Sequence, residues 1–258
     1  TIEFNGTGGL MEGDFGTADI NVNMDPALDF DANSTEEHVL VADHADFDVG
    51  TGAFSTSWWM KTTNTNEFYV VAKMVSAWPG FRYGCHSDGH LQIQLNDNAG
   101  VNADYNGDKN LDDGSWHHCA ITLAGPSGAW KGYVDGVLEL DETAPAYASL
   151  DNSNGLSIGA AYTGGEQPFD GLLADVKFWK GTAVSADDVK ILASKINVDP
   201  SLLSIGTTNL KGWWKLNDGT GLTAVDSSGN SKNGTLTNFT GSDYWQFDAF
   251  SVNAQGSG

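Results

Sequence analysis

Apolar and polar residues alternate cleanly over residues 116–123, which predicts a β-strand with one buried face. A loop rich in Gly, Pro and Ser follows at 124–129, and two short β-prone runs then flank the pair Asp135-Gly136. Such a pair is a strong hairpin signal, because a two-residue type I′ turn needs positive φ at both positions. Residues 113–140 are therefore predicted to hold three consecutive antiparallel strands. On the first strand, one face carries Cys119, Ile121 and Leu123, and the other carries Trp116, His118, Ala120 and Thr122.

Similar runs predict further strands at 27–30, 38–42, 54–60, 68–75, 80–85, 91–95, 155–160 and 171–179. The run at 91–95 alternates Leu and Ile with Gln92 and Gln94, as a sheet with one hydrated face requires. Residues 185–197 form the one predicted helix, with Ser185 as N-cap and Pro200 beyond its end. The chain is predicted to be all-β, with antiparallel strands and this single short helix.

Four segments, in this order, resemble the laminin-G-like branch of the concanavalin A-like lectin and glucanase superfamily. They are residues 27–63, residues 113–140 (DGSWHHCAITL and GYVDGVLEL), residues 169–192 (FDGLLADVKFWKGTAVSADDVKIL) and residues 210–239 (LKGWWKLNDGTGLTAVDSSGNSKNGTLTNF). The resemblance implies a jelly-roll sandwich of two antiparallel sheets. In many relatives the last segment stands before the entry strands. Here it either completes the same sandwich, as a circular permutation would, or begins a truncated second repeat.

The predicted organisation is a Gly-rich arm or hairpin at 1–25, followed by one jelly-roll sandwich at 26–258. Completion of the sandwich is favoured over a second repeat, because a lone strand cannot bury the tryptophans of the last segment. These are Trp213, Trp214 and Trp245. Residues 210–250 are therefore expected to complete the sheets.

The 258 residues include 34 Asp and Glu against 12 Lys and Arg, a formal charge of −22. This charge repels nucleic acid and anionic membranes, so neither is expected as a partner. No apolar run approaches the roughly 20 residues of a membrane span. The charge attracts cations such as Ca²⁺, or else reflects adaptation to salty surroundings. Cys85 and Cys119 are expected either as two buried thiols or as one disulfide.

The sequence gives little support for a catalytic site. Glucanases that share the resemblance carry Glu-x-Asp-x-Glu or Glu-x-Asp-x-x-Glu on a strand, where carboxylates at i and i+4 face the same way and flank the scissile bond. The comparable run, Glu139-Leu140-Asp141-Glu142, lacks the second carboxylate at that spacing. His117 and His118 are adjacent on a strand and diverge, so they cannot chelate one ion together. The chain is therefore not expected to be an enzyme.

Oxygen-bearing residues stand at every second position of DYNGDKNLDD, which resembles the start of a Ca²⁺ loop. A solvated acidic loop is the alternative. The candidate ligands are Asp104, Asn106, Asp108, Asn110 and Asp112. The resemblance implies two further metal positions, Asp175 in the closing strand and Asp31, beside Asp29, in the entry strand.

A glycan site needs flat aromatic rings for stacking and polar side chains for sugar hydroxyls. Loops and the hydrated sheet face offer both kinds of residue, although core packing is the alternative for each aromatic. The candidates are Trp59, Trp78, Tyr105, Tyr162, His86, His90, Gln92 and Gln94.

The favoured hypothesis is a non-catalytic binding module of a virion or extracellular surface assembly, contacting glycans, with Ca²⁺ as a candidate cofactor. Its partners would be glycans or cell-surface polysaccharide, and other structural subunits that include copies of itself. The last segment also resembles arrangements in marine bacteriophage structural proteins and bacterial surface proteins. A purely structural, self-assembling subunit is one alternative. A glycoside hydrolase or polysaccharide lyase with atypical catalytic residues is another.

Overall fold

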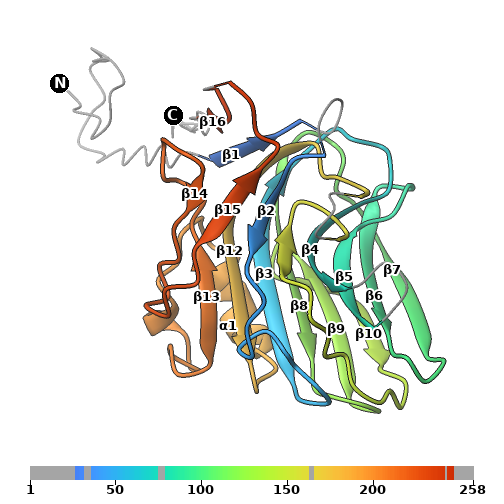
Figure 1. Ribbon diagram of the computed structural model, residues 1–258. Coiled ribbons are helices and arrows are strands. Elements are labelled where there is room, and N and C mark those ends of the chain that lie inside the picture. The colour runs from blue at the N-terminus through green and yellow to red at the C-terminus, as the bar shows by residue number, and fades with distance from the viewer. Residues whose placement is uncertain (1–26, 32–35, 75–78, 163–165, 242, 247–258) are drawn as a thin grey trace, which may run out of the picture.

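The computed structural model describes residues 27–31, 36–74, 79–162, 166–241 and 243–246, which form two packed antiparallel sheets and one α-helix (Figure 1). The predicted all-β sandwich is confirmed. The arm predicted at 1–25 lies outside the described residues.

The first sheet is built around β12, which pairs with three other strands. The strand order is β10 (Val137–Thr143), β9 (Ala129–Val134), β8 (Trp116–Leu123), β3 (Phe54–Lys61), β12 (Gly171–Lys180), β1 (Ala27–Phe30) and β16 (Trp245–Gln246). The remaining strand, β13 (Leu210–Trp214), pairs with the second half of β12.

The second sheet faces the first and ends on one side in the polar edge strand β7. The strand order is β14 (Thr223–Ala224), β15 (Gly234–Thr237), β2 (His38–Val41), β11 (Leu156–Ile158), β4 (Phe68–Met74), β5 (Gly80–Cys85), β6 (His90–Asn96) and β7 (Asn102–Asn110). All the pairings in both sheets are antiparallel, as short alternating strands joined by turns predict.

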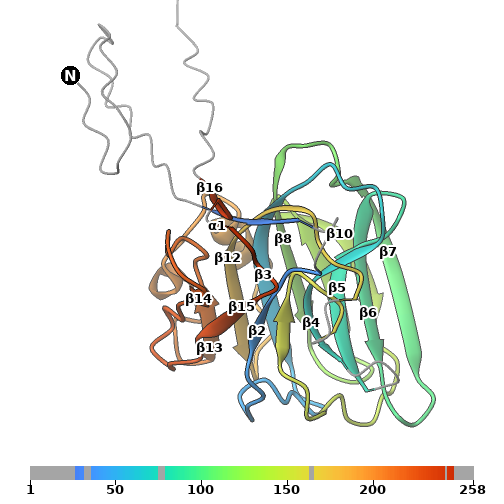
Figure 2. The ribbon, with the colours of Figure 1, turned by 45° about the horizontal axis from the view of Figure 1, so that its top comes forward.

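Strands from the last segment enter both sheets. β13 pairs with β12, β15 with β2, and β16 with β1. In the turned view, β13, β14 and β15 lie together on the side of the sandwich away from β6 and β7 (Figure 2). The tryptophans of the segment are covered as a result. Trp214 is fully buried, and Trp213 and Trp245 are 9% and 7% exposed.

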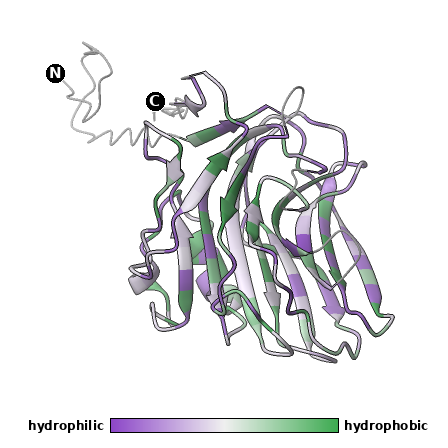
Figure 3. Ribbon diagram, viewed as in Figure 1, coloured by the Kyte–Doolittle hydropathy of each residue, from purple (hydrophilic) through white to green (hydrophobic). Residues whose placement is uncertain are grey.

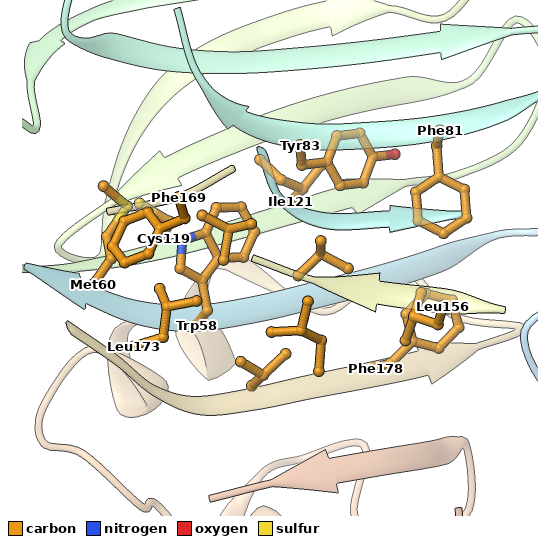
Figure 4. Close-up of a cluster of buried hydrophobic side chains, with 14 of the residues drawn as sticks. Trp58, Met60, Phe81, Tyr83, Cys119, Ile121, Leu156, Phe169, Leu173 and Phe178 are labelled. Atoms are coloured by element: carbon orange, nitrogen blue, oxygen red, sulfur yellow. The ribbon is translucent and has the colours of Figure 1, made fainter. Parts of the chain in front are cut away.

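Apolar side chains from the facing sides of the two sheets fill the interior (Figure 4). Hydrophobic and hydrophilic residues are interspersed along the strands (Figure 3), and strands of both sheets contribute residues to this core. Full burial of one large apolar side chain stabilises the fold by about 1.5–3 kcal/mol, which makes this interior the main source of stability. Cys85 and Cys119 lie in it as free thiols, so the expectation of two buried thiols is confirmed.

The Asp-Gly hairpin predicted between β9 and β10 is present. Asp135 and Gly136 have φ values of 50° and 78°, the left-handed pair that a type I′ turn requires. The backbone N–H of Asp135 donates to the carbonyl of His118 at 2.7 Å. The turn is thereby tied back to β8.

The helix α1 (Ala186–Leu192) begins as predicted and ends earlier than predicted. The side chain of Ser185 caps it by accepting from the N–H of Asp188. Beyond Leu192, the hydroxyl of Ser194 donates to the carbonyl of Ile191, and Asn197 has a φ of 59°, so the helix does not extend to residue 197. With the 3-10 turn η1 (Pro200–Leu202), this segment covers the outer face of the first sheet over a second apolar cluster.

Candidate functional site

The outer face of the second sheet carries a row of polar side chains. Leu91, Ile93 and Leu95 of β6 enter the core, so Gln92 and Gln94 face outward. Arg82 on β5 lies directly opposite Gln94, and Gln94 lies directly opposite Asp104 on β7. The strand register therefore sets guanidinium, amide and carboxylate side by side across three strands.

Tyr162 and Gln167, which come from the connection between β11 and β12, complete this row. Close to Gln167, Phe169 buries its ring and donates its N–H to the carbonyl of Gly159. We call the whole set the Arg82 network. Its members are Glu67, Tyr69, Arg82, Gln92, Gln94, Asp104, Tyr162 and Gln167.

Two glutamines link the guanidinium to two carboxylates. Arg82 Nε donates to Gln94 Oε1, and Gln94 Nε2 donates to Asp104 Oδ2 at 2.8 Å. On the other side, Arg82 Nη1 donates to Gln167 Oε1 at 2.7 Å, and Gln167 Nε2 donates to Glu67 Oε2 at 2.8 Å. Each amide is fixed at both ends, so the guanidinium is held in one orientation by neutral acceptors.

Aromatic rings lie on the same guanidinium. Arg82 Cζ lies 4.3 Å from the centroid of the Tyr69 ring and 5.6 Å from that of Tyr162. Tyr162 Oη also accepts from Arg82 Nη1 at 3.1 Å. Burial, together with the hydrogen bond to Glu67, raises the pKa of Tyr69 well above its usual value. Tyr69 is therefore neutral near neutral pH, where its hydroxyl donates to Glu67 Oε1 at 2.7 Å.

The backbone at Gln167 is strained. Its φ is 50°, a left-handed conformation that residues other than Gly, Asn and Asp seldom adopt. Its carbonyl accepts from the N–H of Tyr69 at 3.2 Å, which helps to hold the loop in this position. Strain of this kind costs about 1–3 kcal/mol and gathers at binding and active sites.

The predicted ligand-binding residues do not all lie together. Gln92, Gln94 and Tyr162 belong to the Arg82 network. Tyr105 turns inward and packs edge-on against Trp130 with ring centroids 5.6 Å apart. The others are dispersed or undescribed. His90 Nδ1 lies 3.5 Å from the Asp88 carboxylate at the β5–β6 turn, and His86 pairs with the same carboxylate. Trp59 lies beside His118 on the outer face of the first sheet. Trp78 falls outside the described residues.

The segment predicted as a Ca²⁺ loop is a strand, so it lacks the expected loop geometry, and metal binding by its side chains stays a prediction. Residues 102–110 form β7, on which Asp104, Asn106 and Asp108 are exposed along one face. Asp104 is held by Gln92 and Gln94, and Asp112 lies beyond the strand end near Gly89. In the described part of the chain, no group of three His, Cys, Asp or Glu side chains is placed to hold a metal ion.

Asp175 is an internal anchor in this fold. It has a φ of 57° at the bulge of β12 and is 2% exposed. Its carboxylate bonds Lys177 Nζ, Trp213 Nε1 and the N–H of Asn197. Burial raises the pKa of Asp175 and lowers that of Lys177, while their mutual attraction opposes both shifts. In this structure the Asp175 carboxylate forms an ion pair with Lys177, and the metal role that the resemblance implies for it stays a prediction.

Asp31 lies near two other carboxylates where β1 ends and β12 begins. Burial, and then repulsion from Asp170 and Asp31, raises the pKa of Asp29. Burial and repulsion from Asp31 likewise raise the pKa of Asp170. Of the predicted metal positions, Asp31 is therefore the one where a cation would relieve repulsion between neighbouring carboxylates.

The residues weighed for catalysis have structural partners. Asp141 pairs with Lys131 at 2.8 Å on the edge of the first sheet. His117 Nδ1 bonds Asp135, whereas burial holds the pKa of His118 at about 3 on the opposite face of β8. The two histidines diverge as predicted. In the described part of the chain, no helix is both long and apolar enough to cross a bilayer.

Comparisons with known proteins agree with the fold. The Sushi, von Willebrand factor type A, EGF and pentraxin domain-containing protein 1 of Mus musculus is 34% identical to this chain over 137 residues. That alignment covers 46% of this chain and 3% of the relative, so the chain spans only a small part of that protein.

Solved structures share the architecture at low identity. A Bacteroides ovatus protein described as a candidate carbohydrate-binding protein superposes with a TM-score of 0.62 at 19% identity, over 83% of this chain and 58% of that one. A heptameric SAP-like pentraxin from Limulus polyphemus gives a TM-score of 0.51 at 18% identity, over 68% and 84%. These identities support the fold alone. The family model described as the concanavalin A-like lectin/glucanases superfamily matches residues 33–190, more than half of the chain, and the protein belongs to this superfamily.

Proposed function

We propose that this domain is a non-catalytic carbohydrate-binding module that contacts a neutral glycan through the Arg82 network. The observation that carries the proposal is the fixed guanidinium at its centre. Arg82 uses its Nε and Nη1 hydrogens on Gln94, Tyr162 and Gln167, and among the described residues neither Nη2 hydrogen has an acceptor. Two donors in one plane suit the neighbouring hydroxyls of a sugar ring.

The surrounding charges favour a neutral ligand over an acidic one. Gln94 links Arg82 to Asp104, and Gln167 links it to Glu67. The network therefore holds two carboxylates and one guanidinium, a net charge of −1. The chain as a whole carries −22. Exposed Asp104 and Asn106 extend the polar row along β7, where they add acceptors and an amide for further hydroxyls. Similarity in fold to a candidate carbohydrate-binding protein supports the same proposal.

The assay is a glycan array, followed by affinity electrophoresis in gels that contain neutral polysaccharides such as laminarin or galactan. Arg82→Ala should weaken binding by about 10–100-fold, because a hydrogen bond from a charged group contributes about 1.5–3 kcal/mol. Lys131→Ala is the matched control, since it removes one cation from the other sheet, where Lys131 pairs with Asp141. Equal binding by the two variants would contradict the proposal. So would an absence of wild-type binding to every glycan.

The wider context is part of the same proposal. We place the module on the surface of an extracellular or virion assembly, in keeping with the sequence resemblance. Calcium dependence remains a prediction, and among the described residues no group of three His, Cys, Asp or Glu side chains gives it a location. A parallel array in EDTA tests it, because a binding event that needs Ca²⁺ will disappear there and return when Ca²⁺ is restored.

A further inference from the structure

One lysine of the second sheet points into the sandwich. Lys73 lies on β4 directly opposite Phe81, a core residue, and only 1% of Lys73 is exposed. Burying an ammonium without compensation is strongly unfavourable, so a lysine at such a position needs a complete set of partners.

Four oxygens surround the Lys73 ammonium at one end of the sandwich. Nζ lies 2.7 Å from Asp43 Oδ1 and 3.2 Å from Asp48 Oδ1. It lies 3.0 Å from the carbonyl oxygen of Asn152 and 2.5 Å from that of Asn154. We call these four oxygens the Lys73 cage. Its two sides come from separate loops, at 43–48 and 152–154.

The carbonyl side of the cage is itself held rigidly. Asn152 Nδ2 donates to the carbonyls of Lys73 and Pro79, and Asn154 Nδ2 donates to the carbonyl of Met74. The Asn154 N–H bonds the side-chain oxygen of Asn152, which fixes the turn between them. The carbonyl side of the cage is therefore held by hydrogen bonds that do not involve the side chain of Lys73.

The four cage oxygens are of the kind that binds a hard metal cation. Ca²⁺ binds carboxylate and carbonyl oxygens at about 2.3–2.6 Å, and water completes its shell of about 6–8 ligands. The cage oxygens lie slightly farther out, at 2.5–3.2 Å from Nζ, as the longer contacts of an ammonium require. The Asp43 side chain is 41% exposed and leaves access for water on its side of the cage, whereas Asp48 Oδ1 is itself buried.

We propose that the Lys73 cage is a cation site that the protein fills with its own ammonium. The ammonium crosslinks the two loops in the way a bound Ca²⁺ would, so their order needs no metal. Without Nζ, the cage carries two carboxylates and two carbonyls with no counter-charge. The emptied cage then becomes a site for Ca²⁺.

The test uses the full chain with Lys73→Met, which keeps an unbranched apolar stem in the core and removes the charged end. Thermal unfolding of the variant and of the wild type is followed by tryptophan fluorescence in EDTA and in millimolar Ca²⁺. The measured quantity is the Ca²⁺-induced rise in Tm of the variant minus that of the wild type. Binding of Ca²⁺ elsewhere on the protein cancels in this difference.

We expect Lys73→Met to melt several degrees below the wild type in EDTA and to recover most of this loss in Ca²⁺. Adding Asp43→Asn should abolish the recovery, because it removes a cage ligand. Lys131→Met, which removes an exposed ammonium, should respond to Ca²⁺ as the wild type does. An equal Ca²⁺ response of Lys73→Met and the wild type would overturn the proposal. If Lys73→Met does not fold in EDTA, folding in Ca²⁺ supports the proposal, and failure in both solutions refutes it.

Discussion

The carboxylate of Asp135 gives the most direct test of how the β9–β10 hairpin is held. Its Oδ1 accepts from the N–H of His118 at 2.9 Å, and its Oδ2 lies 2.9 Å from His117 Nδ1 and 2.7 Å from Lys109 Nζ. Asp135→Asn keeps an acceptor for the backbone and a side chain that tolerates a left-handed φ. It removes the negative charge and replaces Oδ2, the oxygen that faces His117 and Lys109, with an amide nitrogen that cannot accept a hydrogen bond.

The two pKa shifts set the pH window of this interaction. Burial alone would raise the pKa of Asp135, but hydrogen bonds from His117 and Lys109 outweigh it and hold the pKa well below its usual range. The stability that this shift contributes is complete above about pH 4 and is lost as pH falls further. The hydrogen bond to Asp135 raises the pKa of His117. That contribution is complete below about pH 6.5 and is lost as pH rises through the raised pKa.

The exposure of the three side chains sets how much unfolding free energy Asp135→Asn should lose. The side chain of His117 is 6% exposed, and those of Asp135 and Lys109 are 33% and 40% exposed. The bond to His117 should therefore contribute about 1–2 kcal/mol, and the solvent-screened pair with Lys109 about 0.5 kcal/mol. Asp135→Asn should lower the free energy of unfolding by about 1.5–2.5 kcal/mol near pH 5.5, and by about 1 kcal/mol less near pH 8.5.

Urea unfolding followed by tryptophan fluorescence at these two pH values measures the difference. Asp141→Asn is the matched control on the same hairpin. Its carboxylate is 59% exposed and pairs with Lys131, so its removal should cost less than about 0.5 kcal/mol at either pH. A loss in Asp135→Asn that is the same at both pH values, or no larger than that of the control, would refute this account of the hairpin.

Three further predictions concern buried parts of the fold. Lys177→Met should lower the free energy of unfolding by about 3–5 kcal/mol because it leaves Asp175 charged and buried, and adding Asp175→Asn should restore part of that loss in the same urea assay. Burial raises the pKa of Cys85 to about 12, so this thiol should react with a disulfide reagent at pH 8 much more slowly in the folded protein than in urea, and an equal rate would contradict its buried placement. Gly84→Ala should destabilise by at least about 1–3 kcal/mol because its Cβ would lie 2.1 Å from a backbone oxygen of β4, whereas Gly107→Ala, with its nearest contact at 3.6 Å, should be close to neutral by thermal unfolding.

Much of the fold is predictable because local rules suffice for it. Alternation in β6 sets the directions of Leu91 and Gln92, the Asp135-Gly136 pair sets the hairpin, and Ser185 sets the start of the helix. Each of these signals spans only a few residues. No contact with distant parts of the chain is needed to interpret them.

The candidate site was only partly predictable, because it joins distant parts of the chain. The alternation in β6 placed Gln94 on the hydrated face, but nothing local to Arg82 or Gln167 indicates that these residues meet across 85 positions. A strand stands where a Ca²⁺ loop was expected, because oxygen-bearing side chains at every second residue are also the pattern of an edge strand with one solvent face. The left-handed backbone at Asp175, which turns a predicted metal ligand into a buried anchor, has no sequence signal at all.

The pairing of β1 with β16 and of β2 with β15 has a consequence for the time course of folding. During synthesis the earliest strands emerge without the neighbours they will hydrogen-bond to, and they must wait until almost the whole domain has left the ribosome. Proteins dominated by such remote pairings fold slowly, on the scale of milliseconds to seconds, with open strand edges meanwhile exposed to aggregation. A C-terminal truncation that removes residues 234–258 should therefore lower the yield of soluble protein. The decrease should be larger than the few contacts of β15 and β16 would suggest.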